Sequence, residues 1–191
     1  MTGMVVIGAS AGGVQALLTL LPALPADFPR PVLIVVHVPP DHDHGLAGLF
    51  EARCAMQVRE AEDKQLPEPG TIYFAPANYH LLVEPDGSMA LSADDPVNHS
   101  RPSIDVLLES AADALRRRLI AVLLTGANND GAEGLRAVAR AGGTAIVEDP
   151  ETARVPTMPA AGLALCPDAT RLAIDAIAPH LVRLAPSHVR P

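Results

Sequence analysis

The sequence predicts an α/β fold, with a doubly wound, mostly parallel sheet that is flanked by helices. Short apolar runs rich in β-branched residues alternate with segments of helical periodicity, which is typical of strand–helix–strand units. The chain is 49% hydrophobic but only 3% aromatic, so its core is built from Ala, Val, Leu and Ile, as expected of buried parallel strands. We expect the 191 residues to form one domain over residues 1–191.

The first half of the chain begins with two strand–helix pairs. Both strands are short apolar runs, and the glycine-rich segment 8–13 separates the first strand from its helix, which Pro22 ends. The predicted elements are strands over residues 4–7, 32–36 and 57–61 and helices over residues 14–21 and 46–53.

The middle of the chain predicts a small antiparallel β insertion around residues 71–92. Turn residues at Asn78 and 85–87 separate short strand candidates. The strand–helix alternation then returns up to residue 184. The predicted strands cover residues 71–75, 81–84, 89–92, 120–124 and 144–147, and the helices cover residues 103–118, 132–141, 158–165 and 172–184.

Composition and charge exclude several classes of partner. The formal net charge is −8 and no basic stripe carries interleaved aromatic residues, so nucleic acid is not expected as a partner. The N-terminus lacks the basic and long apolar regions of a signal peptide, and no stretch is apolar enough to span a bilayer, so we expect the chain not to be inserted in a membrane. Its two distant cysteines suit a reduced, cytoplasmic protein.

Three polar residues are predicted to meet at one edge of the sheet. Ser10 follows the first strand, His37 follows the second, and Asp130 lies beyond the strand at residues 120–124. Because ligands of doubly wound sheets bind at the carboxyl ends of the strands, this shared edge is the predicted active site.

The segment around Ser10 has the Gly-x-Ser-x-Gly pattern of a nucleophile elbow, with a strand before it and a helix after it. The alternative is a nucleotide-binding turn, since any such fold needs small residues there. That alternative lacks a complete G-x-G-x-x-G pattern, and His37 stands where an NAD site would place an acidic residue. A P-loop is excluded because Gly-Lys-Ser/Thr is missing.

A nucleophilic serine needs a base, and the base needs a carboxylate to orient it. His37 and Asp130 are the candidates for these two roles. Each also has a plain structural interpretation, His37 as a residue that merely ends a strand and Asp130 as the cap of the following helix. Segment 41–44, Asp-His-Asp-His, lacks metal-ligand spacing, so a solvated loop is expected there. We predict neither a metal ion nor a cofactor.

Several separated motifs resemble one known family. They are GASAGG at residues 8–13, HVPP at 37–40, EAED at 60–63, RPSID at 101–105 and LTG…DGA across 124–132. In this order they are similar to the catalytic domain of chemotaxis protein-glutamate methylesterases of the CheB type, from about residue 4 to about residue 184.

The resemblance implies a serine hydrolase with the triad Ser10, His37 and Asp130. It also implies an oxyanion site formed by the backbone N–H groups near Ala11 and Ala127. Arg101 matches a family motif and is the candidate substrate-binding residue. The chain departs from the family at Ala11, where Thr is frequent, and at residues 127–128, where Met-Gly is common.

The substrate that the resemblance implies is a methylated glutamate on the cytoplasmic helices of chemoreceptors, which releases methanol, and some members also deamidate receptor glutamines. The receiver domain usual in the family is not part of this sequence, so three possibilities stay open: a stand-alone enzyme, a shortened chain, and a subunit regulated by a separate receiver protein. Two alternatives stay open: a related esterase for another protein or a small ester, and a catalytically silent signalling module.

Overall fold

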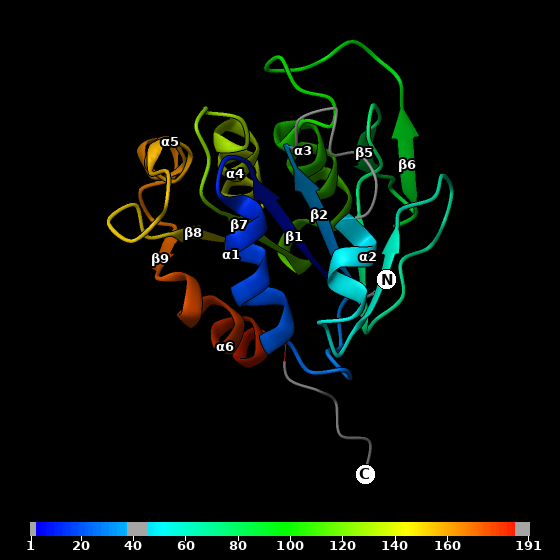
Figure 1. Cartoon of the computed structure of the whole chain (residues 1–191). Helices are drawn as coiled ribbons and strands as arrows, with labels where there is room; N and C mark the ends of the chain where they lie inside the picture. Colours follow the sequence, from blue (N-terminus) through cyan, green and yellow to red (C-terminus); the bar gives the residue numbers. More distant parts are fainter. Residues whose placement is uncertain (1–2, 38–45, 186–191) are drawn as a thin grey trace.

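The structure is a computed structural model that describes residues 3–37 and 46–185. At its centre lies a seven-stranded sheet in the order β3-β4-β2-β1-β7-β8-β9, in which all neighbours pair in parallel (Figure 1). The strands are β1 (Met4–Ala9), β2 (Val32–Val36), β3 (Gln57–Glu60), β4 (Thr71–Phe74), β7 (Leu119–Leu123), β8 (Thr144–Glu148) and β9 (Thr170–Leu172).

Helices cover both faces of this sheet, as predicted for a doubly wound fold. One face packs against α1 (Gly13–Leu20), α2 (Leu46–Glu51) and α6 (Ile174–Leu184). The other face packs against α3 (Ile104–Leu115), α4 (Ala132–Arg140) and α5 (Thr157–Leu165) (Figure 1). Short 3₁₀ helices at Leu21–Ala23 and Arg116–Arg118 extend α1 and α3.

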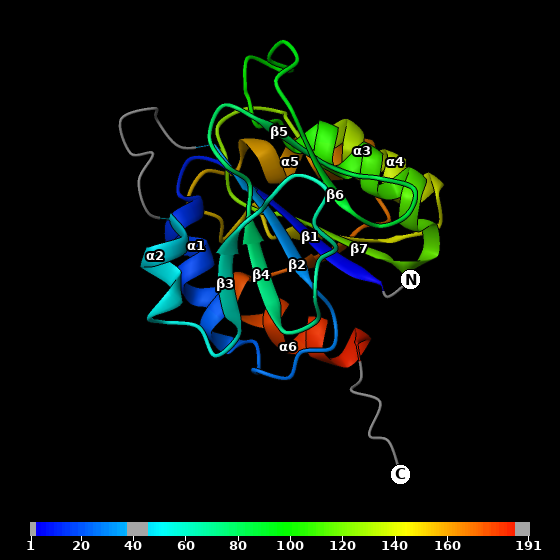
Figure 2. The same ribbon diagram turned by 90° about the vertical axis from the view of Figure 1, so that its right-hand side faces the viewer.

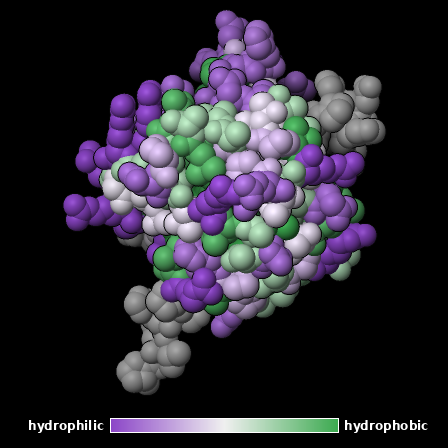
Figure 3. Space-filling view, turned by 90° about the vertical axis from the view of Figure 1, so that its left-hand side faces the viewer, coloured by the Kyte–Doolittle hydropathy of each residue, from purple (hydrophilic) through white to green (hydrophobic). Residues whose placement is uncertain are grey.

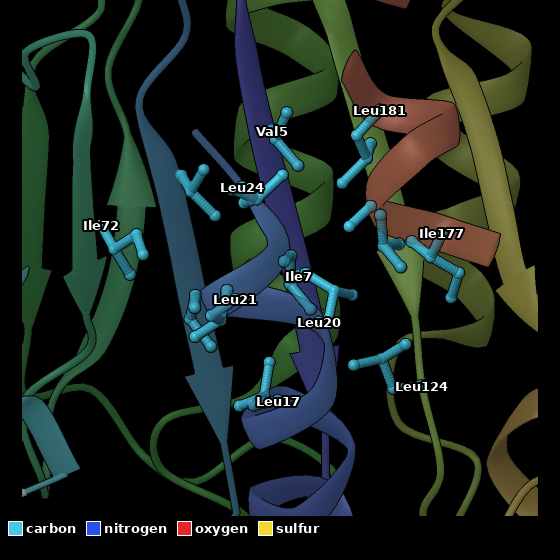
Figure 4. Packing of buried hydrophobic residues seen from close by; sticks show 14 of the residues in the cluster. Val5, Ile7, Leu17, Leu20, Leu21, Leu24, Ile72, Leu124, Ile177 and Leu181 are labelled. Atoms are coloured by element: carbon cyan, nitrogen blue, oxygen red, sulfur yellow. The ribbon is translucent and has the colours of Figure 1, made fainter. Parts of the chain in front are cut away.

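The central strands are buried on both faces, which explains their continuous apolar sequence. In β1, Val5, Ile7 and Ala9 point toward α1 and α6, whereas Met4 and Val6 point toward α3 and α4. Figure 4 shows the first of these layers, where leucines of α1 meet β1 and α6. Each fully buried Leu or Ile contributes about 1.5–3 kcal/mol, so this packing is the main source of stability.

The antiparallel part is smaller than predicted. Among the strands of the described residues, β5 (His80–Val83) and β6 (Met89–Ser92) are the pair that runs antiparallel, and they lie beside α3 (Figure 2). The assignment of residues 71–75 to this insertion is wrong, because β4 pairs in parallel between β2 and β3. All four residues of β4 are buried, which is the pattern of an inner strand rather than of a hairpin with one wet face.

The last strand of the sheet, β9, is absent from the prediction, which placed a helix over residues 172–184. It has three residues, none fully buried, and forms the edge opposite β3. Arg171 of this strand is exposed and pairs with Asp149 and Glu151. Figure 3 shows that hydrophilic side chains are interspersed among apolar ones on the side of the molecule where β9 lies. A short, charged edge of this kind resists pairing with other chains.

Candidate active site

The register of the sheet brings Ser10 and His37 together at its carboxyl edge. Ala9 of β1 is the register partner of Val36 of β2, and the backbone N–H of His37 donates to the Ala9 carbonyl at 3.0 Å. The backbone N–H of Ser10 donates to the carbonyl of Thr125, the second residue after β7, at 2.9 Å. Ser10 therefore lies between the ends of β2 and β7. The alternation of β1 and β2 directs both side chains toward the α3 face.

Two glycines allow the sharp turn around Ser10. Gly12 has φ +81°, the left-handed region that favours glycine, and precedes the first residue of α1. A Cβ at Gly8 would collide with Ile104, so only glycine lets α3 approach β1 this closely. Ser10 is half-buried at the start of this turn, next to the N-terminal, positive end of the α1 dipole.

His37 faces Asp130. Its Nε2 lies 2.9 Å from Oδ2 of Asp130, and the side chains are 13% and 0% exposed. The ring N–H is not aligned with this oxygen well enough for a hydrogen bond of good geometry. Because Nε2 faces the carboxylate, Nδ1 is the ring nitrogen left to accept a proton from a serine. Within the described residues, the Ser10 hydroxyl makes no hydrogen bond.

Asp130 is held by the first turn of α3. Its Oδ2 accepts the backbone N–H of Ile104 at 2.7 Å, and its Oδ1 accepts the N–H of Asp105 at 3.1 Å and the hydroxyl of Ser103 at 2.9 Å. Asp130 thus caps a helix, but it caps α3, not the helix that follows it in sequence. The helix amides fix the carboxylate and direct Oδ2 at the imidazole.

The hydrogen bonds around Asp130 keep it ionised. Burial by itself would raise the pKa of this carboxyl, but the nearby His37 ring and donation from Asn98 and the amides of α3 outweigh burial and lower the pKa to about 2. A charged carboxylate beside the ring stabilises an imidazolium as it forms, which is what a general base requires.

A second buried carboxyl, Asp105, lies next to Asp130. Its Oδ1 accepts the backbone N–H of Gly134 in the first turn of α4 at 2.7 Å. Asp130, from the loop before α4, binds α3, while Asp105, from α3, binds α4. Burial raises the pKa of Asp105 to about 6, and the charge of Asp130 acts in the same direction. The Asn98 side chain joins the two carboxyls. Sequence reasoning missed Asn98 and Asp105 as functional candidates.

The predicted oxyanion donors lie on the exposed side of the same edge. Ala11 and Ala127 are exposed, and among the described residues neither backbone N–H has a protein acceptor. The hydroxyl of Thr125 connects their loops, since it donates to the Ala11 carbonyl at 2.9 Å and accepts the N–H of Val155 at 2.9 Å. The backbone N–H of Thr125 donates to the buried carboxyl of Glu148 at 2.7 Å, and burial raises the pKa of that carboxyl.

Arg101 lies beside the site but is engaged with its own loop. One guanidinium nitrogen donates to the carbonyls of Ala93 and Asp94, at 2.8 and 3.0 Å. Its role in substrate binding stays a prediction. The segment 41–44 falls outside the described residues. Within residues 3–37 and 46–185, no three acidic, histidine or cysteine side chains gather as metal ligands, and no helix is long and apolar enough to cross a bilayer.

The arrangement suits acyl transfer. It combines a half-buried hydroxyl just after a central strand, an imidazole just after the neighbouring strand, a buried carboxylate next to the ring and, among the described residues, two backbone N–H groups without a protein acceptor in the loops at this edge. The residues that sequence reasoning missed support this arrangement from behind. Asp105 belongs to the RPSID segment at 101–105, which could have drawn attention to it, whereas the Asn98-His99-Ser100 segment reads as an accidental glycosylation sequon.

Comparisons with known proteins agree on one family. The family model described as CheB methylesterase matches residues 5–181. A protein of Leptospira interrogans, provisionally named protein-glutamate methylesterase/protein-glutamine glutaminase, is 43% identical over 180 residues, which cover 94% of this chain and 93% of that protein. The Symbiobacterium thermophilum protein-glutamate methylesterase/protein-glutamine glutaminase is 42% identical over 156 residues, 82% of this chain and 43% of that longer protein.

Structural similarity leads to the same family. The crystal structure of the Thermotoga maritima CheB methylesterase catalytic domain superposes with a TM-score of 0.91 at 36% identity, and the match covers 96% of this chain and 99% of that one. Sequence, fold and the order of the motifs therefore agree, and this chain belongs to the CheB methylesterase family.

Proposed function

We propose that this chain is a protein-glutamate methylesterase that works as a serine hydrolase, with Ser10 as nucleophile, His37 as general base and Asp130 as the carboxylate that orients it. The observation that carries the proposal is the buried pair of His37 and Asp130 beside Ser10, with 2.9 Å between Nε2 and Oδ2. Membership of the CheB methylesterase family adds the substrate class.

In the first half of the reaction, Oγ of Ser10 attacks the ester carbonyl while Nδ1 of His37 takes the hydroxyl proton. The carbonyl oxygen becomes an anion, which the N–H groups of Ala11 and Ala127 stabilise. The bond to the methoxy group then breaks, His37 gives its proton to the leaving oxygen, and methanol departs. Asp130 stabilises the imidazolium throughout.

In the second half, water attacks the acyl-serine carbonyl and gives a proton to His37. The oxyanion forms again in the same place, the bond to Oγ breaks, and His37 returns the proton to Ser10. The products are a glutamate side chain and the free enzyme. With a glutamine side chain as substrate, the same steps release ammonia in place of methanol, so deamidation needs no further residue.

The proposed substrate is a methylated glutamate on the cytoplasmic helices of chemoreceptors, and a separate receiver protein is the proposed regulator. The free N–H groups of Ala11 and Ala127 are exposed, so a side chain presented on the surface of another protein can reach them. This accessibility suits a protein substrate.

The test measures methanol release from radiolabelled, methylated receptor. We expect the wild-type protein to release methanol and the folded Ser10→Ala variant to release none above background. Thr19→Ala is the matched control, because Thr19 carries an exposed hydroxyl on α1, the helix that begins just after the Ser10 turn. Normal turnover by Ser10→Ala would contradict the proposed nucleophile.

A small methyl ester tested in parallel separates the two open alternatives. Turnover of the small ester without receptor demethylation would favour a related esterase of different specificity. Absence of turnover on both substrates would favour a catalytically silent module and would overturn the proposed function.

A further inference from the structure

A tight turn beside the site carries a side chain that reaches the buried carboxyls. Val97 and Ser100 exchange two backbone hydrogen bonds, of 3.1 and 2.9 Å, and the two residues between them have φ values of +53° and +62°. These are the features of a two-residue hairpin turn of type I′, in which asparagine is favoured. The turn is exposed, yet the amide of Asn98 points inward.

The loop that holds this turn is attached at two further points. The guanidinium of Arg101 donates to the carbonyls of Ala93 and Asp94, which closes the base of the loop. The ring of the buried His80 links Asp95 to the start of α3: its Nδ1 accepts the N–H of Ser103, so its Nε2 carries the proton that goes to the Asp95 carbonyl. The position of Asn98 is thus fixed from both sides.

The side-chain amide of Asn98 uses both of its N–H groups on carboxylates. Nδ2 lies 2.8 Å from Oδ2 of Asp105 and 2.8 Å from Oδ1 of Asp130. The opposite orientation of the amide would put its oxygen against two carboxylate oxygens, so the donor side must face inward. A single amide nitrogen therefore bridges the two buried acids.

The two acids are held next to each other. The backbone N–H groups of Ile104 and Asp105 in α3 donate to Asp130, and the side chain of Asp105 is bound in turn to the first turn of α4. Two buried carboxylates that share one amide nitrogen lie close enough to repel each other, and without a donor between them one takes up a proton. A proton shared by the pair would weaken the negative charge that faces His37. The bridging amide opposes that outcome by donating to both carboxyls, while burial still raises the pKa of Asp105 to about 6.

We propose that Asn98 is a positioning residue for the esterase reaction: its amide holds Asp105 and Asp130 side by side as separate carboxylates, so that Asp130 keeps its full charge and its orientation toward His37. The inference rests on the proposed function for the effect on turnover, but its effect on His37 can be measured without a substrate.

Asn98→Gly removes the amide and keeps the turn, because glycine accepts a positive φ. We expect kcat to fall about 10- to 100-fold, the equivalent of one hydrogen bond to a charged group, with KM little changed. The titration midpoint of the His37 ring, followed by NMR and assigned with His37→Gln, should move to lower pH. His99→Asn, in the same turn, is the matched control and should leave both readouts unchanged.

The decisive variant is Asn98→Gly combined with Asp105→Asn. If the amide acts by separating two charges, neutralising Asp105 removes the need for it, and the double variant should recover most of the lost kcat. If Asn98 only anchors the loop, the double variant will be no better than Asn98→Gly, and the proposal is overturned. An unchanged midpoint in Asn98→Gly also overturns it. If the wild-type protein has no esterase activity, the NMR readout alone still decides.

Discussion

The two faces of the sheet differ in the polarity of the groups that they bury. On the face covered by α1, α2 and α6, an apolar cluster forms the core, and the alternation of β8 places the buried carboxyl of Glu148 at the end of that strand. On the other face, the N-terminal ends of α3 and α4 meet over buried polar groups, and Asp130 and Asp105 each bind the first turn of one of these helices. Burying a carboxylate is unfavourable unless it is fully hydrogen-bonded, so the face with two adjacent buried carboxyls carries the larger desolvation cost.

The difference shows where stability and chemistry are located. Apolar packing tolerates a changed shape with a graded loss of stability, because it has no directional requirement. The polar network accepts only one arrangement of donors and acceptors. We therefore expect substitutions on the α1–α6 face to change stability and those at the α3–α4 ends to change activity first.

The largest effect is expected from Asp130→Asn. The amide would place a donor against the N–H groups of α3 or against the imidazole, so His37 would lose its oriented carboxylate. By comparison with other triads, kcat/KM should fall by about 10⁴-fold. Receptor demethylation by the folded variant measures this, with circular dichroism as the check on folding. A loss of less than tenfold would contradict the role of Asp130.

On the opposite face, Leu181→Ala should lower the free energy of unfolding by about 2–5 kcal/mol, since it leaves a cavity in a fully buried layer. Urea denaturation measures this loss. The activity of the folded fraction should equal that of the wild-type protein. A fall in kcat as large as that of Asp130→Asn would break the contrast between the two faces.

Thr125→Val tests a smaller contact at the site itself. It removes the hydroxyl that connects the carbonyl of Ala11 to the N–H of Val155. Both contacts are part-buried, and a typical intramolecular hydrogen bond contributes about 0.5–1.5 kcal/mol, so the variant should lose stability on that scale, and kcat should fall with the displaced oxyanion loops. Thr125→Ser keeps the hydroxyl and is the matched control. Equal stability and equal kcat in the two variants would contradict the role given to the Thr125 hydroxyl.

The smallest effect is a pH dependence of stability. The folded pKa of Asp130 is lowered, so its contribution is present above its ordinary value of 3.8 and is lost as pH falls toward 2. The folded pKa of Asp105 is raised from 3.8 to about 6, so between these two values the folded state keeps a proton that the unfolded state has lost. The free energy of unfolding therefore declines as pH rises from 3.8 to about 6. Urea denaturation between pH 2 and pH 8 should show that decline in the wild-type protein and not in Asp105→Asn. The same pH dependence of the unfolding free energy in both proteins would contradict the raised pKa of Asp105.

The parts of the fold that depend on local pattern could be predicted from the sequence. Strands β1, β2, β7 and β8 are continuous apolar runs, and their parallel order brings Ser10 and His37 to one edge. The parallel pairing of β4 does not follow from the sequence, because four buried residues between turns look alike in a hairpin and in a parallel sheet. Strand β9 is too short and too exposed to produce a pattern.

The supporting residues of the site could not be predicted, because long-range contacts create them. Asp105 reads as an ordinary acidic residue in the first turn of a helix, and only the approach of α4 gives it a partner. Asn98 is one polar residue in a polar loop until the turn directs its amide inward. Its place in the sequence suggests Asp130 as a cap of the next helix, but tertiary packing makes it a cap of α3.

The most direct test of the account asks whether Ser10 is activated by His37 and Asp130. A serine-directed fluorophosphonate is reacted with the wild-type protein and with His37→Gln, and the labelled residue is located by mass spectrometry. We predict one phosphonate on Ser10 of the wild-type protein and almost none on the variant. Labelling of Ser10 at the same rate in both proteins, or its absence from the folded wild-type protein, would contradict the account.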